Sequence, residues 1–255
     1  MKKAYNSKGK YFFFLGLLSI CLLFFNSACG LDELDAILDD PFSTDHIPNI
    51  DSYEDGRFFS FSTKKLDNAN EFGKGYVYYK IYNSSSKMDS EVNTIESMIN
   101  DSARKYNSAT SLIDNYGYKE LCLASSYAGI SRANTFSLEN KDQTVRIRLT
   151  NQVDSTDDYS ARIKVDDVIK GIPVRANINK TFDFGRTENS YEGLPLKDDD
   201  DTKGFSETQP DSDTNNYYVV LYGVFYMLSD TFEKTIYSPV HYLGKVKIDS
   251  TSTAN

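Results

Sequence analysis

The 255-residue chain contains no tryptophan, only two histidines and only three cysteines. The histidines, His46 and His241, have no second histidine or free cysteine at metal-ligand spacing. The sequence also lacks the G-x-S-x-G, H-E-x-x-H and C-x-x-C motifs of serine hydrolases, zinc peptidases and thiol redox proteins. Because no catalytic motif is present, we predict that the protein is not an enzyme and uses no cofactor. We interpret His241 as a structural residue.

The N-terminal segment has three parts. Four lysines and no acidic residue precede an almost purely apolar run at residues 11–25, and small or polar residues follow at 26–28. This order is typical of a secretory signal. The run is about 15 residues long, whereas a membrane-spanning helix needs roughly 20. We therefore predict that residues 1–28 are an export signal.

The end of this segment indicates the kind of signal. Cys29 directly follows Ser27 and Ala28, with Asn26 where a Leu-type residue is usual. This stretch resembles the lipobox of bacterial lipoproteins, in the relaxed form of spirochaetes. The resemblance implies cleavage between Ala28 and Cys29, acylation of Cys29 with palmitate-type chains, and attachment to a membrane of the cell envelope. Cys21 is the weaker alternative, because the apolar run continues past it. The leaflet stays open.

The remaining chain is acidic. Without residues 1–28 it carries 24 basic and 37 acidic side chains, a net charge of −13. Such a protein is a poor partner for nucleic acid, and we predict no binding of it. Cys122 is then the one thiol besides Cys29, which excludes an internal disulfide. Its position between two leucines indicates a small buried hydrophobe and not a reactive thiol.

Two acidic segments stand apart from the rest. Residues 30–51 contain seven acids, two prolines and no Lys or Arg, and we predict an acidic solvated tether over 29–52. Residues 186–216 contain nine acids against three bases and no apolar periodicity, and we predict a mobile loop. Aspartates of this loop are weak calcium candidates, since hard cations prefer oxygen ligands, but a solvated charge run is the favoured interpretation. They are Asp198, Asp199, Asp200, Asp201, Asp211 and Asp213.

Between and after these segments, the chain alternates apolar and polar residues. The pattern predicts a mainly β domain over 53–250, an antiparallel β-sandwich of fibronectin-III or immunoglobulin type, followed by a tail at 251–255. The expected strands lie within 57–63, 75–82, 145–150, 159–165, 172–178, 181–185, 217–228 and 245–248. Segments 75–82 and 217–228 are apolar on both faces. We therefore expect them to be neighbours in one sheet that is covered on both sides.

One segment has a helical period instead. Met88, Val92, Ile95 and Ile99 recur at the spacing of one helix face. We predict a helix over about 88–106, inserted in the β domain and covering the outer face of the doubly apolar sheet.

Two surfaces leave alternatives open. Tyr76, Tyr78 and Tyr82 form either a platform for a sugar or core beneath the helix. A set of basic residues forms either a docking face for an acidic partner or ordinary outward positions of strands, partly neutralised by nearby aspartates. The set consists of Arg146, Arg148, Arg162, Lys164 and Arg175.

Taken with the signal, these features predict a lipid-anchored envelope lipoprotein with a non-enzymatic binding or structural domain. The sequence does not identify its ligand, for which a protein and a carbohydrate are the two candidates. The alternative is an envelope hydrolase that uses carboxylates not identifiable from the sequence. Two carboxylates facing each other at roughly 5 to 9.5 Å would favour that alternative.

Overall fold

A computed structural model describes residues 37–48, 57–150, 160–177, 180–184, 194–205, 216–229 and 233–249. The predicted export signal, Cys29, Asp211, Asp213 and the predicted tail lie outside the described residues. Within the described ranges, no helix is long and apolar enough to cross a membrane.

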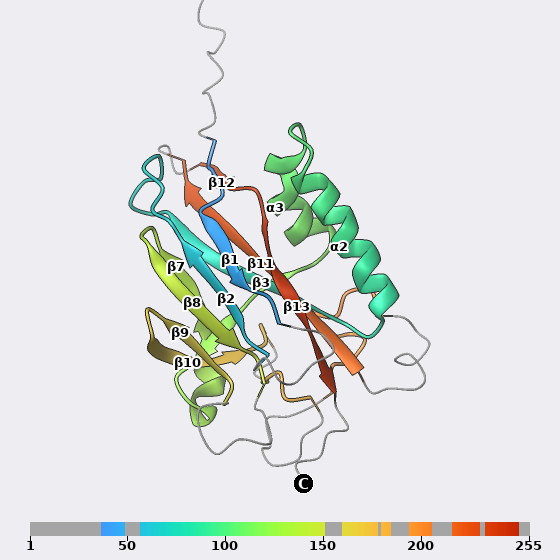
Figure 1. The fold of residues 1–255 in the computed structure, drawn as a ribbon. Coiled ribbons are helices and arrows are strands. Elements are labelled where there is room, and N and C mark those ends of the chain that lie inside the picture. The colour runs from blue at the N-terminus through green and yellow to red at the C-terminus, as the bar shows by residue number, and fades with distance from the viewer. Residues whose placement is uncertain are drawn as a thin grey trace, which may run out of the picture. The chain divides into compact units, whose positions relative to one another are not determined.

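The described chain is mainly β, with two antiparallel sheets (Figure 1), which confirms the predicted sandwich. The first sheet has the order β1 (Phe42–His46), β2 (Phe59–Thr63), β8 (Gln143–Arg148), β9 (Arg162–Val165), β10 (Val168–Val174), β5 (Cys122–Ala124) and β6 (Asn134–Thr135). The second has β12 (Thr235–Tyr237), β11 (Asn216–Leu228), β3 (Lys74–Tyr82) and β4 (Lys119–Glu120), with β13 (His241–Asp249) beside β11 and β7 (Ser137–Glu139) beside β3. The fibronectin-III or immunoglobulin type stays a prediction.

The two strands that are apolar on both faces are neighbours, as predicted. β3 and β11 pair antiparallel along nine residue pairs, from Tyr82 opposite Tyr218 to Lys74 opposite Tyr226. Because side chains alternate along a strand, one set of each strand joins the core between the sheets. The other set joins a second core with the helix. This pair is therefore buried on both faces along most of its length, but its outer face is partly open at the end where Lys74 lies opposite Tyr226.

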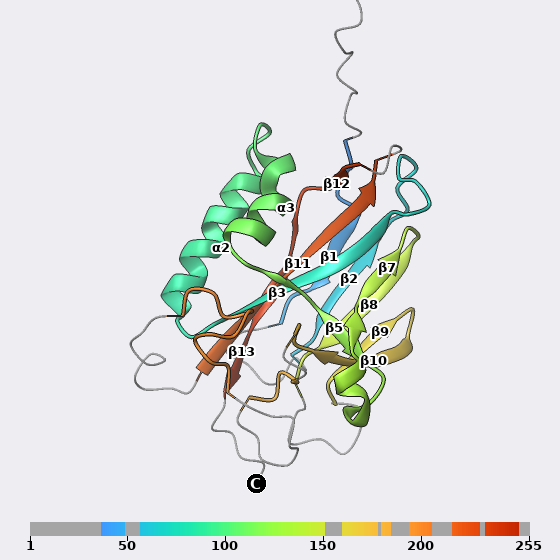
Figure 2. The ribbon, with the colours of Figure 1, turned by 180° about the vertical axis from the view of Figure 1, so that it is seen from behind.

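The helix lies on the outer face of this sheet, but its boundaries differ from the prediction. α2 spans Ser85–Ile99, begins at the N-cap Ser84, and buries Met88, Val92 and Ile95. It ends earlier than predicted because the Asp101 side chain accepts a hydrogen bond from the Ala103 N–H, which favours a turn. Short helical turns follow, and Figure 2 shows α2 and α3 on one side of the sheet. They are the 3₁₀ turn Lys105–Asn107, α3 (Ser108–Thr110) and the π turn Ser111–Asn115; a further 3₁₀ helix covers Tyr127–Arg132.

The predicted tether over 29–52 is wrong for residues 37–48, which belong to the folded domain. β1 pairs with β2, and Leu38 and Phe42 are buried in the core between the sheets. The Phe42 ring lies 5.9 Å from the Phe61 ring. Burial of these two apolar side chains holds the acidic segment on the domain. The prediction failed because it was based on the acids and prolines of the segment and not on its individual apolar residues.

A short stretch connects the two sheets. β4 pairs with β3 in the second sheet, whereas β5 pairs with β10 in the first. Leu121 lies between them, and its N–H donates to the Val77 carbonyl. This crossing carries Glu120 to the outer face of the second sheet. Of the strand predicted at 181–185, the structure describes residues 181–184, which form no strand, but Phe182 and Phe184 are buried in the core.

Candidate functional site

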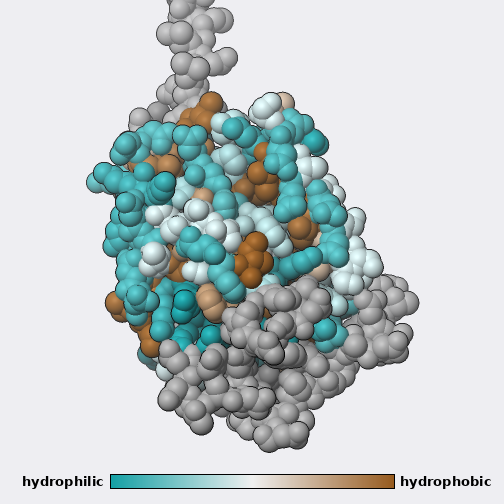
Figure 3. Space-filling model, viewed as in Figure 1, coloured by the Kyte–Doolittle hydropathy of each residue, from teal (hydrophilic) through white to brown (hydrophobic). Residues whose placement is uncertain are grey.

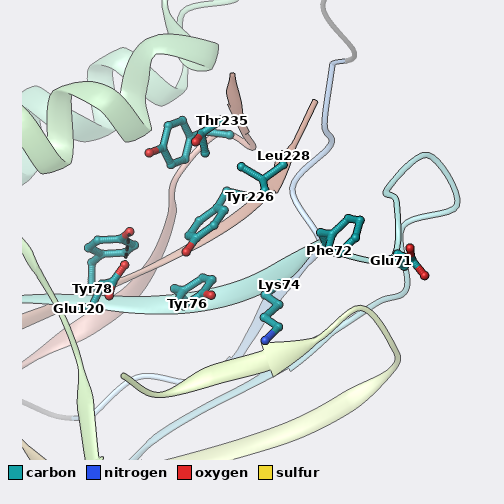
Figure 4. A pocket seen from close by; sticks show the side chains of 10 residues that line it. Glu71, Phe72, Lys74, Tyr76, Tyr78, Glu120, Tyr226, Leu228 and Thr235 are labelled. Atoms are coloured by element: carbon teal, nitrogen blue, oxygen red, sulfur yellow. Dashed lines mark hydrogen bonds between the residues drawn. The ribbon is translucent and has the colours of Figure 1, made fainter. Parts of the chain in front are cut away.

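The surface offers few broad apolar areas on the face seen in Figure 3, where hydrophobic residues of the described chain form small separate patches in a largely hydrophilic surface. A hollow of about 650 Å³ is a stronger candidate for a binding site than these apolar patches (Figure 4). We call it the tyrosine cleft. Its volume lies within the roughly 300–1,000 Å³ of small-molecule sites. It is lined by Glu71, Phe72, Lys74, Tyr76, Tyr78, Glu120, Tyr226, Leu228, Thr235 and Tyr237.

The cleft exists because α2 covers only part of β3. At one end of β3, Glu91 of α2 accepts hydrogen bonds from Lys80 and Tyr82. At the other end, Lys74, Tyr76 and Tyr78 line the cleft. All these side chains project from the same face, since they are two residues apart along the strand. Of the three tyrosines considered for a sugar platform, Tyr82 and Tyr78 are therefore buried in the core beneath the helix. Tyr78 also lines the cleft, and only Tyr76 is half-buried there.

The tyrosine rings are arranged in contact with one another. Tyr76 stacks on Tyr226, with ring centroids 4.4 Å apart and planes 4° apart. Tyr237 meets Tyr226 nearly edge-on at 5.7 Å. These residues come from three neighbouring strands, and Tyr226 is the register partner of Tyr237. Burial raises the pKa of Tyr226 and of Tyr237, so both phenols remain neutral at physiological pH.

One carboxylate is held in place at the cleft. The Tyr78 hydroxyl donates to Glu120 Oε1 at 3.1 Å, and the Thr135 hydroxyl donates to Oε2 at 3.2 Å. Burial, and secondarily the nearby Glu120 charge, raises the pKa of Tyr78, so its proton stays available for this bond. Two donors fix the plane of the carboxylate. The remaining lone pairs are able to accept hydrogen bonds from a ligand.

The second carboxylate of the cleft lies at its opposite end. Figure 4 shows Glu120 beside Tyr78, and Glu71 beside Phe72. The four residue steps of β3 from Lys74 to Tyr78 already extend about 13 Å. The two carboxylates therefore do not form the facing pair that glycoside hydrolysis requires.

A second hollow of about 510 Å³ adjoins the tyrosine cleft and shares Glu71 and Lys74 with it. Its other lining residues are Lys65, Ala69, Asn70, Gly73, Glu139 and Asn140. The phenyl ring of Phe72, which is 45% exposed, lines the first hollow beside this junction. The two hollows together offer room for a ligand longer than one small molecule.

The acidic loop predicted to be mobile is fixed at residues 194–205. Arg175, fully buried, donates from Nε and Nη2 to the two oxygens of Asp201 at 2.8 and 2.7 Å, and from Nη2 to Asp199 at 2.8 Å. The Tyr79 hydroxyl also donates to Asp201 at 2.7 Å. This part of the prediction is wrong, because a buried guanidinium needs these carboxylates as partners.

Two of the six calcium candidates have a buried arginine as their partner in the structure. Asp199 and Asp201 already bind Arg175, whereas Asp198 and Asp200 are exposed. Among the residues that the structure describes, no group of three His, Cys, Asp or Glu is placed to hold a metal ion. Asp211 and Asp213 lie outside that part of the chain.

Four of the five predicted basic residues lie together. In the β8–β9 register, Arg146 faces Lys164 and Arg148 faces Arg162. The Arg146 guanidinium also lies 4.3 Å from the centre of the Phe58 ring. Of these four, Arg148 is buried, so only Arg146, Arg162 and Lys164 reach solvent. Arg175 lies apart from them, since it follows the end of β10 and turns into the interior.

His241 joins two distant parts of the chain. Its Nδ1 lies 2.6 Å from Asp40 Oδ2, and its Nε2 lies 3.0 Å from the Thr44 hydroxyl. That hydroxyl donates its proton to the Tyr242 carbonyl, so it is not directed at the imidazole as a nucleophile would be. These bonds tie β1 to β13, in agreement with a structural role. Cys122 is half-buried, and burial raises the pKa of its thiol, which makes it less reactive.

No protein-family model, no curated protein and no solved structure matches this chain. The evidence for function therefore comes from its own residues. The sequence patterns did not single out Glu120, Tyr226 and Tyr237. The alternation of 217–228 places Tyr226 on the same face as Tyr218 and Tyr222, but no local pattern indicates that the helix leaves it uncovered.

Proposed function

We propose that the protein is a lipid-anchored lipoprotein of the cell envelope whose β domain binds a ligand in the tyrosine cleft without transforming it. The observation that carries the binding role is the cleft itself, with its contacting tyrosine rings and one carboxylate held by Tyr78 and Thr135. The anchor rests on the sequence, in which Cys29 follows an apolar run and Ala28.

In the sequence, the described residues begin eight positions after the proposed lipidation site. Only residues 30–36 separate Cys29 from Ile37. Seven residues have a contour length of at most about 25 Å. Acylation of Cys29 would therefore hold the β domain near the bilayer surface, where its ligand would be a component of the envelope or its immediate surroundings.

The geometry gives little support to the alternative, an envelope hydrolase. The carboxylates of the cleft, Glu71 and Glu120, lie at opposite ends, and the hydroxyl nearest His241 donates to a carbonyl. Binding without turnover accounts for both observations.

The anchor is tested by substituting each cysteine in cells supplied with labelled palmitate. We expect Cys29→Ser to abolish the label and to move the protein from the detergent phase to the aqueous phase of a Triton X-114 separation. Cys21→Ser and Cys122→Ser are the matched controls and should keep both properties. Label that survives Cys29→Ser would refute acylation of Cys29, and label that is lost only in Cys21→Ser would assign it to Cys21 instead.

A further inference from the structure

We propose that the tyrosine cleft binds a neutral glycan chain, with the C–H faces of the sugar rings against Tyr76, Tyr226 and Tyr237 and a sugar hydroxyl on Glu120. This inference rests on the proposed binding function and names the ligand class for the same site.

The side chains suit the two-sided character of a sugar ring. A pyranose has an apolar C–H face and a rim of hydroxyls. Tyr76, Tyr226 and Tyr237 are half-buried, so each offers apolar ring surface together with a hydroxyl. At the end of the cleft, Glu120 accepts from Tyr78 and Thr135 and is held ready to accept from a ligand hydroxyl.

The charges of the cleft argue against an ionic ligand. A cation held between aromatic rings needs a gap between them, but Tyr76 and Tyr226 are stacked at 4.4 Å. Lys74 also offsets one of the two carboxylates, Glu71 and Glu120, that would attract a cation. An anion would meet Glu71 and Glu120 on a strongly acidic protein. A neutral polyol avoids both penalties, because hydroxyls donate to carboxylates and accept from an ammonium group.

The length of the hollow favours an oligosaccharide over a single sugar. The adjoining hollow shares Glu71 and Lys74 with the tyrosine cleft, and Phe72 supplies another partly exposed aromatic ring beside them. A chain of several sugar units would contact Glu120 at one end and Phe72 at the other, with Tyr76 and Tyr226 between them.

The test uses an array of neutral hexose and N-acetylhexosamine oligosaccharides, two to six units long, printed beside matched uronic-acid oligosaccharides and neutral decapeptides. We expect the mature protein to bind at least one neutral glycan series, to bind longer members more tightly, and to bind the uronic-acid counterparts at least tenfold more weakly. Glycans recovered after incubation should be unchanged in length.

Three variants localise the binding. Tyr226→Ala and Glu120→Gln should each weaken binding at least tenfold, whereas Tyr106→Ala, a tyrosine outside the cleft, should leave it unchanged. Glu120→Gln keeps an acceptor for Tyr78 and is therefore expected to fold, which a thermal melt would verify.

Absence of neutral-glycan binding, a preference for anionic glycans or peptides, or binding that survives both cleft substitutions would overturn the glycan proposal. Peptide binding lost in the cleft variants would keep the cleft as a binding site and reject only its ligand class. Shortened glycans would reject the non-enzymatic role. The palmitate experiment is independent of all these results.

Discussion

Replacement of Asp201 by alanine tests how the 194–205 segment is held. Asp201 is fully buried and accepts from Arg175 through both oxygens and from the Tyr79 hydroxyl. Its loss leaves a guanidinium in the interior with Asp199 as its remaining carboxylate partner. The Tyr79 hydroxyl, which accepts from the Ala176 N–H, loses its own acceptor.

The expected magnitude follows from this environment. Removal of one partner of a buried ion pair typically lowers the free energy of unfolding by about 3–5 kcal/mol. We expect the lower end, about 3 kcal/mol, because Asp199 still neutralises part of the Arg175 charge. In a protein of this size, about 3 kcal/mol lowers the melting temperature by roughly 6–12 °C.

Urea unfolding followed by circular dichroism measures this change. The matched control is Asp198→Ala, the same substitution at an exposed position of the same acidic run. It should change the unfolding free energy by less than about 0.5 kcal/mol. Equal stability of the two variants would show that Arg175 does not fix the segment. It would instead support the prediction from composition that residues 194–205 belong to a mobile loop.

Two further predictions concern the helix and the pH dependence. Ile95→Asp places a charge on the buried face of α2 and should cost at least about 4 kcal/mol, whereas Asn93→Asp on the exposed face should melt like the wild type; equal melting temperatures would contradict the packing of α2. Although burial opposes it, hydrogen bonds from the Leu196 N–H and Arg175 lower the pKa of Asp199 below its ordinary value of 3.8. A lowered pKa adds stability above the unfolded value, which is lost as the pH falls through the folded one. Asp199→Asn should therefore lose less stability than the wild type between about pH 5 and pH 3 in urea titrations, and parallel losses would contradict the ion pair.

Local patterns were enough to predict much of the framework. β2 and β8 follow from alternation, and β3 and β11 follow from segments that are apolar on both faces. α2 follows from the spacing of Met88, Val92 and Ile95, because burying one face requires a fixed period. The pairing of β3 with β11 was also predictable, since strands that are apolar on both faces need cover on both.

Predictions from composition were wrong where the contacts of a few residues determine the structure of a whole segment. The acids of the two segments, and the prolines of the first, predicted that neither would fold, yet Leu38 and Phe42 fix part of the first and Arg175 fixes part of the second. The partners lie far away in the chain. No local pattern predicts a buried ion pair, because its stability depends on which oppositely charged side chain the fold places next to the first one.

The tyrosine cleft is a property of the tertiary structure alone. The alternation placed Tyr76, Tyr78 and Tyr226 on outward faces, but the length of α2 and its position over the sheet decided which of these faces stay open. Glu120 reaches the cleft only because the chain crosses between sheets at Leu121. A binding surface assembled from four strands depends on the order of those strands in the sheet. That order is set by packing over the whole domain, and the periodicity of a single segment does not contain it.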